Sequence, residues 1–167
     1  MSDLQNVKSV VRNFYQDFDT AKVEDLSSVL NNHTSDDFFW RGMCPFYIQN
    51  SVTDAVEAFW KPLKTSLTNM QRREDIFFAG DNAAREHEGY DDSQWTCSMG
   101  HFMGLFDADF LLIPATRRIA YLRYAEFCKV ENGKITEMAL FCDLIGLMHQ
   151  AGVYPLPPMT GTYFMYP

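Results

Sequence analysis

The sequence predicts one α+β domain, a half-barrel in which helices cover the concave face of a mostly antiparallel sheet. Helical periodicity dominates the first part of the chain, and aromatic-rich segments typical of strands dominate the rest. Helices followed by strands indicate separate layers rather than alternating βαβ units. At 167 residues the chain is long enough for one domain with a hydrophobic core, and short for two.

The N-terminal segment has the pattern of an amphipathic helix that needs a sheet to cover. Ser2 or Asp3 is a suitable N-cap, and a shorter helix over Val23–Leu30 is expected after Thr20. Apolar residues recur at three- and four-residue spacing on one stripe of the first helix: Leu4, Val7, Val10, Val11, Phe14, Tyr15 and Phe18.

A later helix begins at Ser51, where Ser51-x-x-Asp54 forms a capping box. The helix is expected to run to about Leu67. Pro62 should kink it, because the proline ring removes one backbone hydrogen bond. The kink lies beneath Trp60 and would widen a pocket there, although simple packing tolerance explains the proline equally well.

Extended segments make up most of the remaining chain. In the longest of them, Gly100 and Gly104 leave one face without side chains, which allows a helix or a ligand to come close. His101 points the other way. The strands expected before the closing hairpin are Asp37–Arg41, Gln71–Ala79 and Trp95–Phe106.

The closing hairpin and helix have the clearest local pattern. Ile119–Val130 and Lys134–Cys142 have extended character, and Asn132-Gly133 supplies the two positive φ angles of a tight turn. Asp143 can cap the helix that follows, and Gly152 can end it. Counting from the turn places Leu122, Tyr124, Glu126, Cys128 and Val130 on one face of the first strand, and Met138, Leu140 and Cys142 on one face of the second.

Charge and composition exclude several classes of function. A formal net charge of −8 disfavours nucleic acid and anionic membranes as partners, since both require a basic face. Four cysteines without CxxC spacing, and the lack of a signal peptide or a membrane-length apolar run, predict a cytoplasmic protein. His87 lies in an acidic loop without a second histidine or cysteine at ligand spacing, so no metal site is predicted.

The block V-E-N-G-K-I followed by D-L-I-G-L-M-H-Q-A-G resembles the closing hairpin and tail of SnoaL-like proteins. These form the polyketide-cyclase branch of the nuclear-transport-factor-2-like superfamily. Earlier landmarks fit in the same order, so that the resemblance covers about residues 3 to 158. Those landmarks are Phe38–Gly42 with Pro45-Phe46, Phe59–Leu63, Gly100–Gly104 and Ile113–Thr116.

This resemblance implies a cone-shaped sheet, a ligand cavity between sheet and helices, and a homodimer packed through the other face of the sheet. It also implies that neither a metal nor an organic cofactor is needed. The SnoaL-like domain is expected to span residues 1–152. The tail, residues 153–167, is rich in proline and aromatic residues and is expected to lie on the cavity mouth or on a partner subunit.

Polyketide cyclases of this family close a ring by an intramolecular aldol reaction, with an aspartate of the last strand as acid and base. By the resemblance, the position of that aspartate holds Leu140, and the position of a supporting histidine holds Glu126. A leucine cannot transfer a proton. The resemblance therefore does not by itself assign cyclase activity.

Glu126 is the candidate general base, because burial on the concave face would disfavour its charged form and make it a better proton acceptor. His101 and Tyr124 are candidates for polarising a carbonyl group or holding an enolate oxygen. The structural alternative for Glu126 is an ion pair with an arginine such as Arg123 or Arg41. His101 has an alternative role as a buried, hydrogen-bonded histidine of the core.

Three functions remain open from the sequence. The first is a cofactor-independent enzyme that cyclises, isomerises or dehydrates a small apolar carbonyl compound by proton transfer. The second is a non-catalytic protein that binds a hydrophobic metabolite, and the third is a dimeric scaffold with a filled cavity. Asp143 can serve as helix cap or as base. The residues expected to line a ligand site are Trp40, Phe46, Trp60, Tyr124, Leu140 and Asp143.

Overall fold

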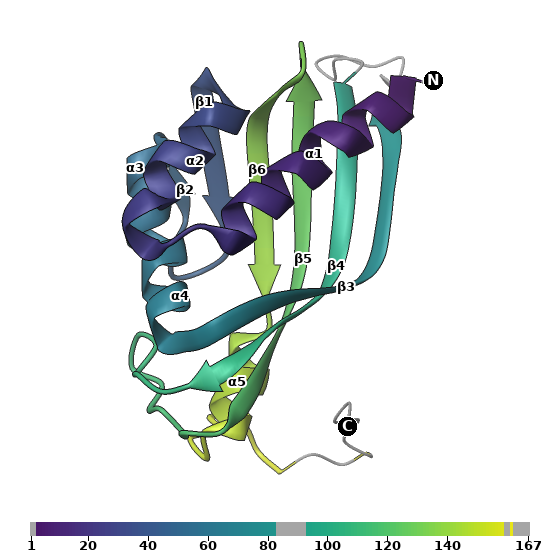
Figure 1. Cartoon of the computed structure of the whole chain (residues 1–167). Coiled ribbons are helices and arrows are strands. Elements are labelled where there is room, and N and C mark those ends of the chain that lie inside the picture. Colours follow the sequence, from purple (N-terminus) through teal and green to yellow (C-terminus); the bar gives the residue numbers. More distant parts are fainter. Residues whose placement is uncertain (1–2, 83–92, 159–160, 162–167) are drawn as a thin grey trace.

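A computed structural model describes residues 3–82, 93–158 and 161, and Figure 1 shows their arrangement. Helix α1 (Asp3–Thr20) lies across one face of a curved sheet. A 3₁₀ turn (Val23–Asp25) and α2 (Leu26–His33) follow, and the helical segments between Val52 and Ser66 stand beside them. Helix α5 (Leu144–Gln150) lies at the lower end. His87 lies outside the described residues.

The sheet is six-stranded, mostly antiparallel and open, with the order β2-β1-β6-β5-β4-β3. Only the pair of β1 and β6 is parallel among the described strands. The α+β fold class predicted from the sequence is confirmed. The strands are β1 (Thr34–Gly42), β2 (Ile48–Gln49), β3 (Leu67–Asn82), β4 (Ser93–Phe106), β5 (Ile119–Glu131) and β6 (Lys134–Cys142).

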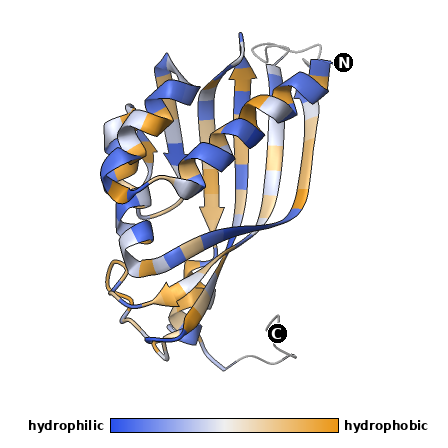
Figure 2. Ribbon diagram, in the orientation of Figure 1, coloured by the Kyte–Doolittle hydropathy of each residue, from blue (hydrophilic) through white to orange (hydrophobic). Residues whose placement is uncertain are grey.

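Helix α1 packs against β3, β4, β5 and β6 on the concave face, here called the inner face. Its buried stripe, Val7, Val11, Phe14, Tyr15 and Phe18, follows the predicted spacing. Figure 2 shows hydrophilic residues along the outward side of this helix. The core therefore lies between the inner face of the sheet and the helices.

The helix that starts after Ser51 is interrupted before Pro62. The Ser51 hydroxyl accepts the Asp54 backbone N–H at 3.1 Å, so the predicted cap is present. Helix α3 (Val52–Ala55) is followed by a π-helical segment (Val56–Trp60) and by α4 (Lys61–Ser66). The Lys61 N–H bonds the Val56 carbonyl five residues back. The irregularity expected at Pro62 therefore takes the form of a wider π turn just before it.

The closing hairpin agrees with its prediction. Asn132 and Gly133 have φ angles of 51° and 75°, which are typical of a type I′ turn. The even-numbered side chains from Leu122 to Val130 are buried on the inner face, as expected. The glycines of β4 allow the neighbouring strand β3 to come close. A Cβ on Gly100 would lie 1.9 Å from the Arg73 carbonyl oxygen.

Asp143 caps α5, because its carboxylate accepts the Gly146 backbone N–H at 2.7 Å. Replacing Asp143 by alanine is expected to lower the free energy of unfolding by about 1 kcal/mol. Asp25 is a matched control, since it stands at the N-cap of α2 without a capping side-chain bond. Equal losses for Asp25→Ala and Asp143→Ala in urea denaturation would contradict the assignment.

No helix within the described ranges is both long and apolar enough to cross a membrane. Residues 153–158 follow α5 without regular secondary structure. Of the remaining tail only residue 161 is described, so the expected packing of the tail stays a prediction.

Candidate functional site

Glu126 lies at the centre of the inner face and is completely buried. Its carboxylate accepts a hydrogen bond from Arg72 of β3, with 2.8 Å between Oε2 and Nη1. The alternative of an ion pair is thus confirmed, but the partner is neither Arg41 nor Arg123. A buried carboxylate without a cation would be very costly, and Arg72 supplies that cation.

Arg72 links Glu126 to helix α1. Its Nε donates to Asp19 at 3.0 Å, and its side chain is only 4% exposed. Four aromatic rings surround the guanidinium carbon, and the Tyr15 ring centroid is the nearest at 3.8 Å. Aromatic faces stabilise a cation that has been removed from water. The other three rings are those of Phe102, Tyr124 and Trp60.

Burial and charge shift the pKa values of the groups around this pair. Burial opposes the charge on Arg72, but Glu126 and Asp19 outweigh it and raise the arginine pKa well above its usual value. Burial, followed by the charge of Glu126, raises the pKa of Tyr15 well above normal. The same two causes raise the pKa of the Cys128 thiol. The phenol and the thiol therefore stay protonated, and the guanidinium stays charged.

Several polar atoms of this region are buried without a hydrogen-bond partner among the described residues. Most buried polar atoms in proteins do have a partner, and exceptions mark strain, a catalytic role, or the position of a water or an ion. All of them are sealed from solvent. The four that concern the Arg72–Glu126 pair and its neighbours are Tyr15 Oη, Arg72 Nη2, Thr96 Oγ1 and Glu126 Oε1.

The structure does not bring His101 to this site. His101 stands on the opposite, outer face of β4, where its Nδ1 lies 3.3 Å from the Asp75 carboxylate. The inner face of β4 carries Ser98 and Phe102 instead. His101 and Glu126 therefore do not face one cavity, and the two predicted catalytic residues cannot act on the same group.

The expected ligand-binding residues fall into two groups. Five of them are buried in the core: Trp40, Trp60, Tyr124, Leu140 and Phe46. Leu140 of β6 pairs directly with Glu126 of β5. The Tyr124 hydroxyl shares a 2.9 Å hydrogen bond with Ser98, in which either group can be the donor. Asp143 lies apart from them at the start of α5, where it caps the helix.

Sequence reasoning missed Arg72, Asp19 and Tyr15. Tyr15 belongs to the predicted stripe of α1, but a stripe identifies a buried face and not the partner of one hydroxyl. Arg72 stands beside Arg73 in β3, and nothing in the sequence distinguishes the inner arginine from the outer one. The only available signal was the need of a buried Glu126 for a cation.

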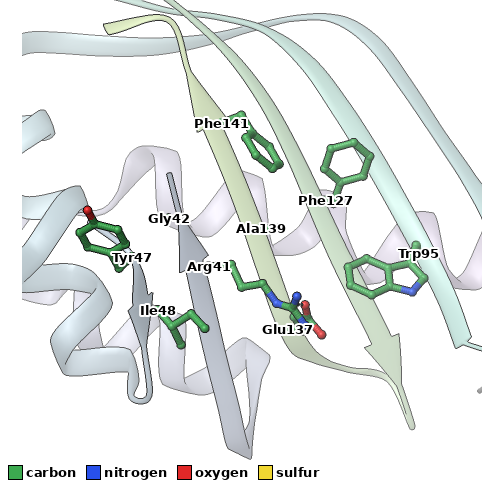
Figure 3. Close-up of a pocket in the computed structure, with 9 residues that line it drawn as sticks. All are labelled: Arg41, Gly42, Tyr47, Ile48, Trp95, Phe127, Glu137, Ala139 and Phe141. Atoms are coloured by element: carbon green, nitrogen blue, oxygen red, sulfur yellow. Dashed lines mark ion pairs between the residues drawn. The ribbon is translucent and has the colours of Figure 1, made fainter. Parts of the chain in front are cut away.

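The outer face carries an open pocket of about 690 Å³ (Figure 3). The rings of Phe127, Phe141 and Trp95 lie on one side of the Arg41–Glu137 ion pair, and Tyr47 and Ile48 lie on the other. Within the part of the chain that the structure describes, no cluster of histidine, cysteine and acidic side chains is arranged to hold a metal ion.

No protein-family model matches the sequence, and no curated protein matches it. Solved structures do resemble it. One is named as a SnoaL-like polyketide cyclase from Jannaschia sp. CCS1, with a TM-score of 0.63 and 18% identity over 95% of this chain and 98% of that one. Another is IdmH from Streptomyces antibioticus, named as a polyketide cyclase, with a TM-score of 0.59 and 15% identity over 87% and 98%.

An NTF2-like protein from Burkholderia thailandensis E264 has a TM-score of 0.58 and 18% identity, over 86% of this chain and 95% of that one. Identities at this level speak for the fold and not for a reaction. The chain therefore has the same fold as these SnoaL-like and NTF2-like structures.

Proposed function

We propose that this protein binds a small, apolar carbonyl compound between α1 and the sheet and transfers a proton to or from it through Glu126. The observation that carries the proposal is the fully buried carboxylate with one oxygen on Arg72 and the other, Oε1, without a partner. An unpaired carboxylate oxygen in an apolar surrounding can accept a proton from carbon. The reaction class is cyclisation, isomerisation or dehydration without a cofactor.

Several features of the site support an apolar ligand. The core around Glu126 is built from aromatic rings, among them Trp60, Phe102 and Tyr124. Arg72, Asp19 and Glu126 together carry one net negative charge, which disfavours an anionic ligand. Because the unpaired atoms are sealed from solvent, ligand entry requires the side chains around them to move apart.

Hydrogen–deuterium exchange on a simple ketone tests the proposal. We expect the protein to accelerate exchange of the α-hydrogens of 2-tetralone in D₂O, as measured by proton NMR. Glu126→Gln should reduce the acceleration by about 100-fold or more, because removal of a general base costs at least that factor. His101→Gln on the outer face is the matched control and should leave exchange unchanged.

The alternative is a protein that binds a hydrophobic compound without converting it. Leu140 favours this alternative, because it occupies the position that holds the catalytic aspartate in the cyclases that the sequence resembles. Binding of 2-tetralone without accelerated exchange would support the alternative. Absence of binding would contradict both functions.

We also propose that the protein forms a homodimer through the outer face of the sheet. Apolar residues form two neighbouring rows across the outer face of the sheet. One row contains Ile76, Met99, Ala125 and Phe141, from β3, β4, β5 and β6, and the second contains Phe78 and Phe127. Phe78 and Phe141 are 52% and 55% exposed. A contiguous apolar patch of this kind on a soluble protein usually marks an interface.

Phe141→Arg is expected to convert the dimer into monomers, because it places a charge in the middle of the buried patch. Light scattering after size-exclusion chromatography measures the change in mass. Leu112→Arg is the control, since Leu112 is 98% exposed on the loop between β4 and β5 and lies outside the patch. A wild-type protein that is monomeric at high concentration would refute the dimer.

A further inference from the structure

We infer that Tyr15 and Arg72 are the two donors that hold the oxygen of the bound carbonyl compound, in place of His101 and Tyr124. The inference rests on the proposed function and names further residues for it. Tyr15 Oη and Arg72 Nη2 are buried and make no hydrogen bond of good geometry within the described residues, and the Tyr15 hydroxyl lies near enough to Glu126 for hydrogen bonding to that carboxylate to help raise the tyrosine pKa. Both border the carboxylate of Glu126.

The geometry of Arg72 makes it suited to this role. Its guanidinium is planar and its donors are fixed relative to one another. Nε is engaged by Asp19 and Nη1 by Glu126, which leaves the second terminal nitrogen for a ligand. One rigid group thus touches the base and, through its remaining nitrogen, the place where an oxygen would sit. Arg72 therefore fixes the position of the ligand oxygen relative to the carboxylate of Glu126.

Tyr15 supplies the second donor from a different element. Its ring stacks on the guanidinium at 3.8 Å, so its position depends on Arg72. The hydroxyl approaches Glu126, whose charge adds to burial in raising the tyrosine pKa. The phenol therefore keeps its proton and remains a donor. Donors that are already in place for a developing oxyanion stabilise it without reorganisation.

Charge is conserved in the site when a proton moves. Glu126 takes a proton from the carbon next to the carbonyl group, and the electrons of the C–H bond form the C=C bond of the enolate. The carbonyl π electrons move onto the oxygen, so the negative charge passes from Glu126 to the ligand. Arg72 faces two anions before the step, Asp19 and Glu126, and two after it, Asp19 and the ligand oxyanion. The site consequently favours a neutral ligand when Glu126 is charged and an oxyanion when Glu126 is neutral.

This charge exchange can be measured with 4-nitrophenolate, a stable aromatic oxyanion whose binding changes its absorbance. In Glu126→Gln the side chain is neutral, as it would be after proton transfer. We expect this variant to bind 4-nitrophenolate at pH 8.5 at least about 10-fold more tightly than the wild-type protein does, because it lacks the repelling charge.

The two donors are then removed in the Glu126→Gln background. Tyr15→Phe keeps the ring and should weaken 4-nitrophenolate binding about 10-fold or more, as expected for a hydrogen bond to a charged group. Arg72→Lys keeps the charge but loses the fork and should weaken binding similarly. Tyr121→Phe on the outer face should have no effect. Thermal unfolding of each variant identifies those that remain folded.

The possible results separate the two proposals. If Glu126→Gln binds neither 4-nitrophenolate nor neutral phenol, the interior site and the proposed function are both wrong. If Glu126→Gln binds 4-nitrophenolate and a folded Tyr15→Phe or Arg72→Lys double variant binds it equally well, that donor is wrongly assigned while Glu126 stands. Each folded variant decides the question for its own residue.

Discussion

Replacing Arg72 by methionine should lower the free energy of unfolding by about 3 to 5 kcal/mol, because it leaves the fully buried Glu126 without a cation. The methionine fills most of the volume of the arginine stem, so a cavity contributes little. In a domain of this size the change corresponds to a fall in Tm of roughly 2 to 4 °C per kcal/mol. Urea denaturation followed by circular dichroism measures the loss.

A second substitution shows whether charge causes the loss. Arg72→Met combined with Glu126→Leu removes both members of the ion pair, and we expect it to recover most of the lost stability. Asp19 remains, but its side chain is 24% exposed and can be hydrated. If the double variant were as unstable as Arg72→Met alone, the aromatic contacts of the guanidinium and not its charge would be the main contribution.

The position of Glu126 was predictable because it depends on local geometry. The side chains of β5 alternate between the two faces without a break from Ala120 to Val130, although the register against β6 shifts between Lys129 and Val130. The helix cap at Asp143 follows from the same block. For these residues the sequence determines the structure over a few positions, without any knowledge of distant segments.

The partner of Glu126 was not predictable by the same method. The register of β3 against β4 shifts twice, between Thr68 and Gln71 and again between Glu74 and Ile76. Alternation cannot be counted through such irregularities. Arg72 lies between the two shifts, so its inward orientation is a result of tertiary packing.

His101 shows how the register between strands limits such reasoning. Its orientation away from Gly100 and Gly104 was predicted correctly from β4 alone. Whether Glu126 faces the same side depends on the pairing of Ser98 with Glu126, which is set by the loop between β4 and β5. That loop has no turn signal that fixes the register. The sequence shows which residues share a face within β4 and within β5. It does not show which face of β4 lies on the same side of the sheet as a given face of β5.

Gly100→Ala should be among the most destabilising single substitutions, at about 3 kcal/mol, although it adds only one methyl group. The new Cβ would lie 1.9 Å from the Arg73 carbonyl oxygen and 3.1 Å from the Glu74 Cα. Both are backbone atoms of β3, which cannot rotate away as a side chain would. Relief requires β3 to separate from β4, and overpacking of this kind costs a few kcal/mol.

Gly80→Ala is the matched control, since it lies in the same strand pair and its Cβ would meet no atom within 4 Å. We expect its unfolding free energy to stay within about 0.5 kcal/mol of the wild-type value. Gly100→Ala should in addition weaken binding of neutral phenol, because the displaced backbone at Arg73 adjoins Arg72. A Gly100→Ala protein with full stability would mean that β3 does not cross β4 so closely, and the inward orientation of Arg72 would then lose its structural basis.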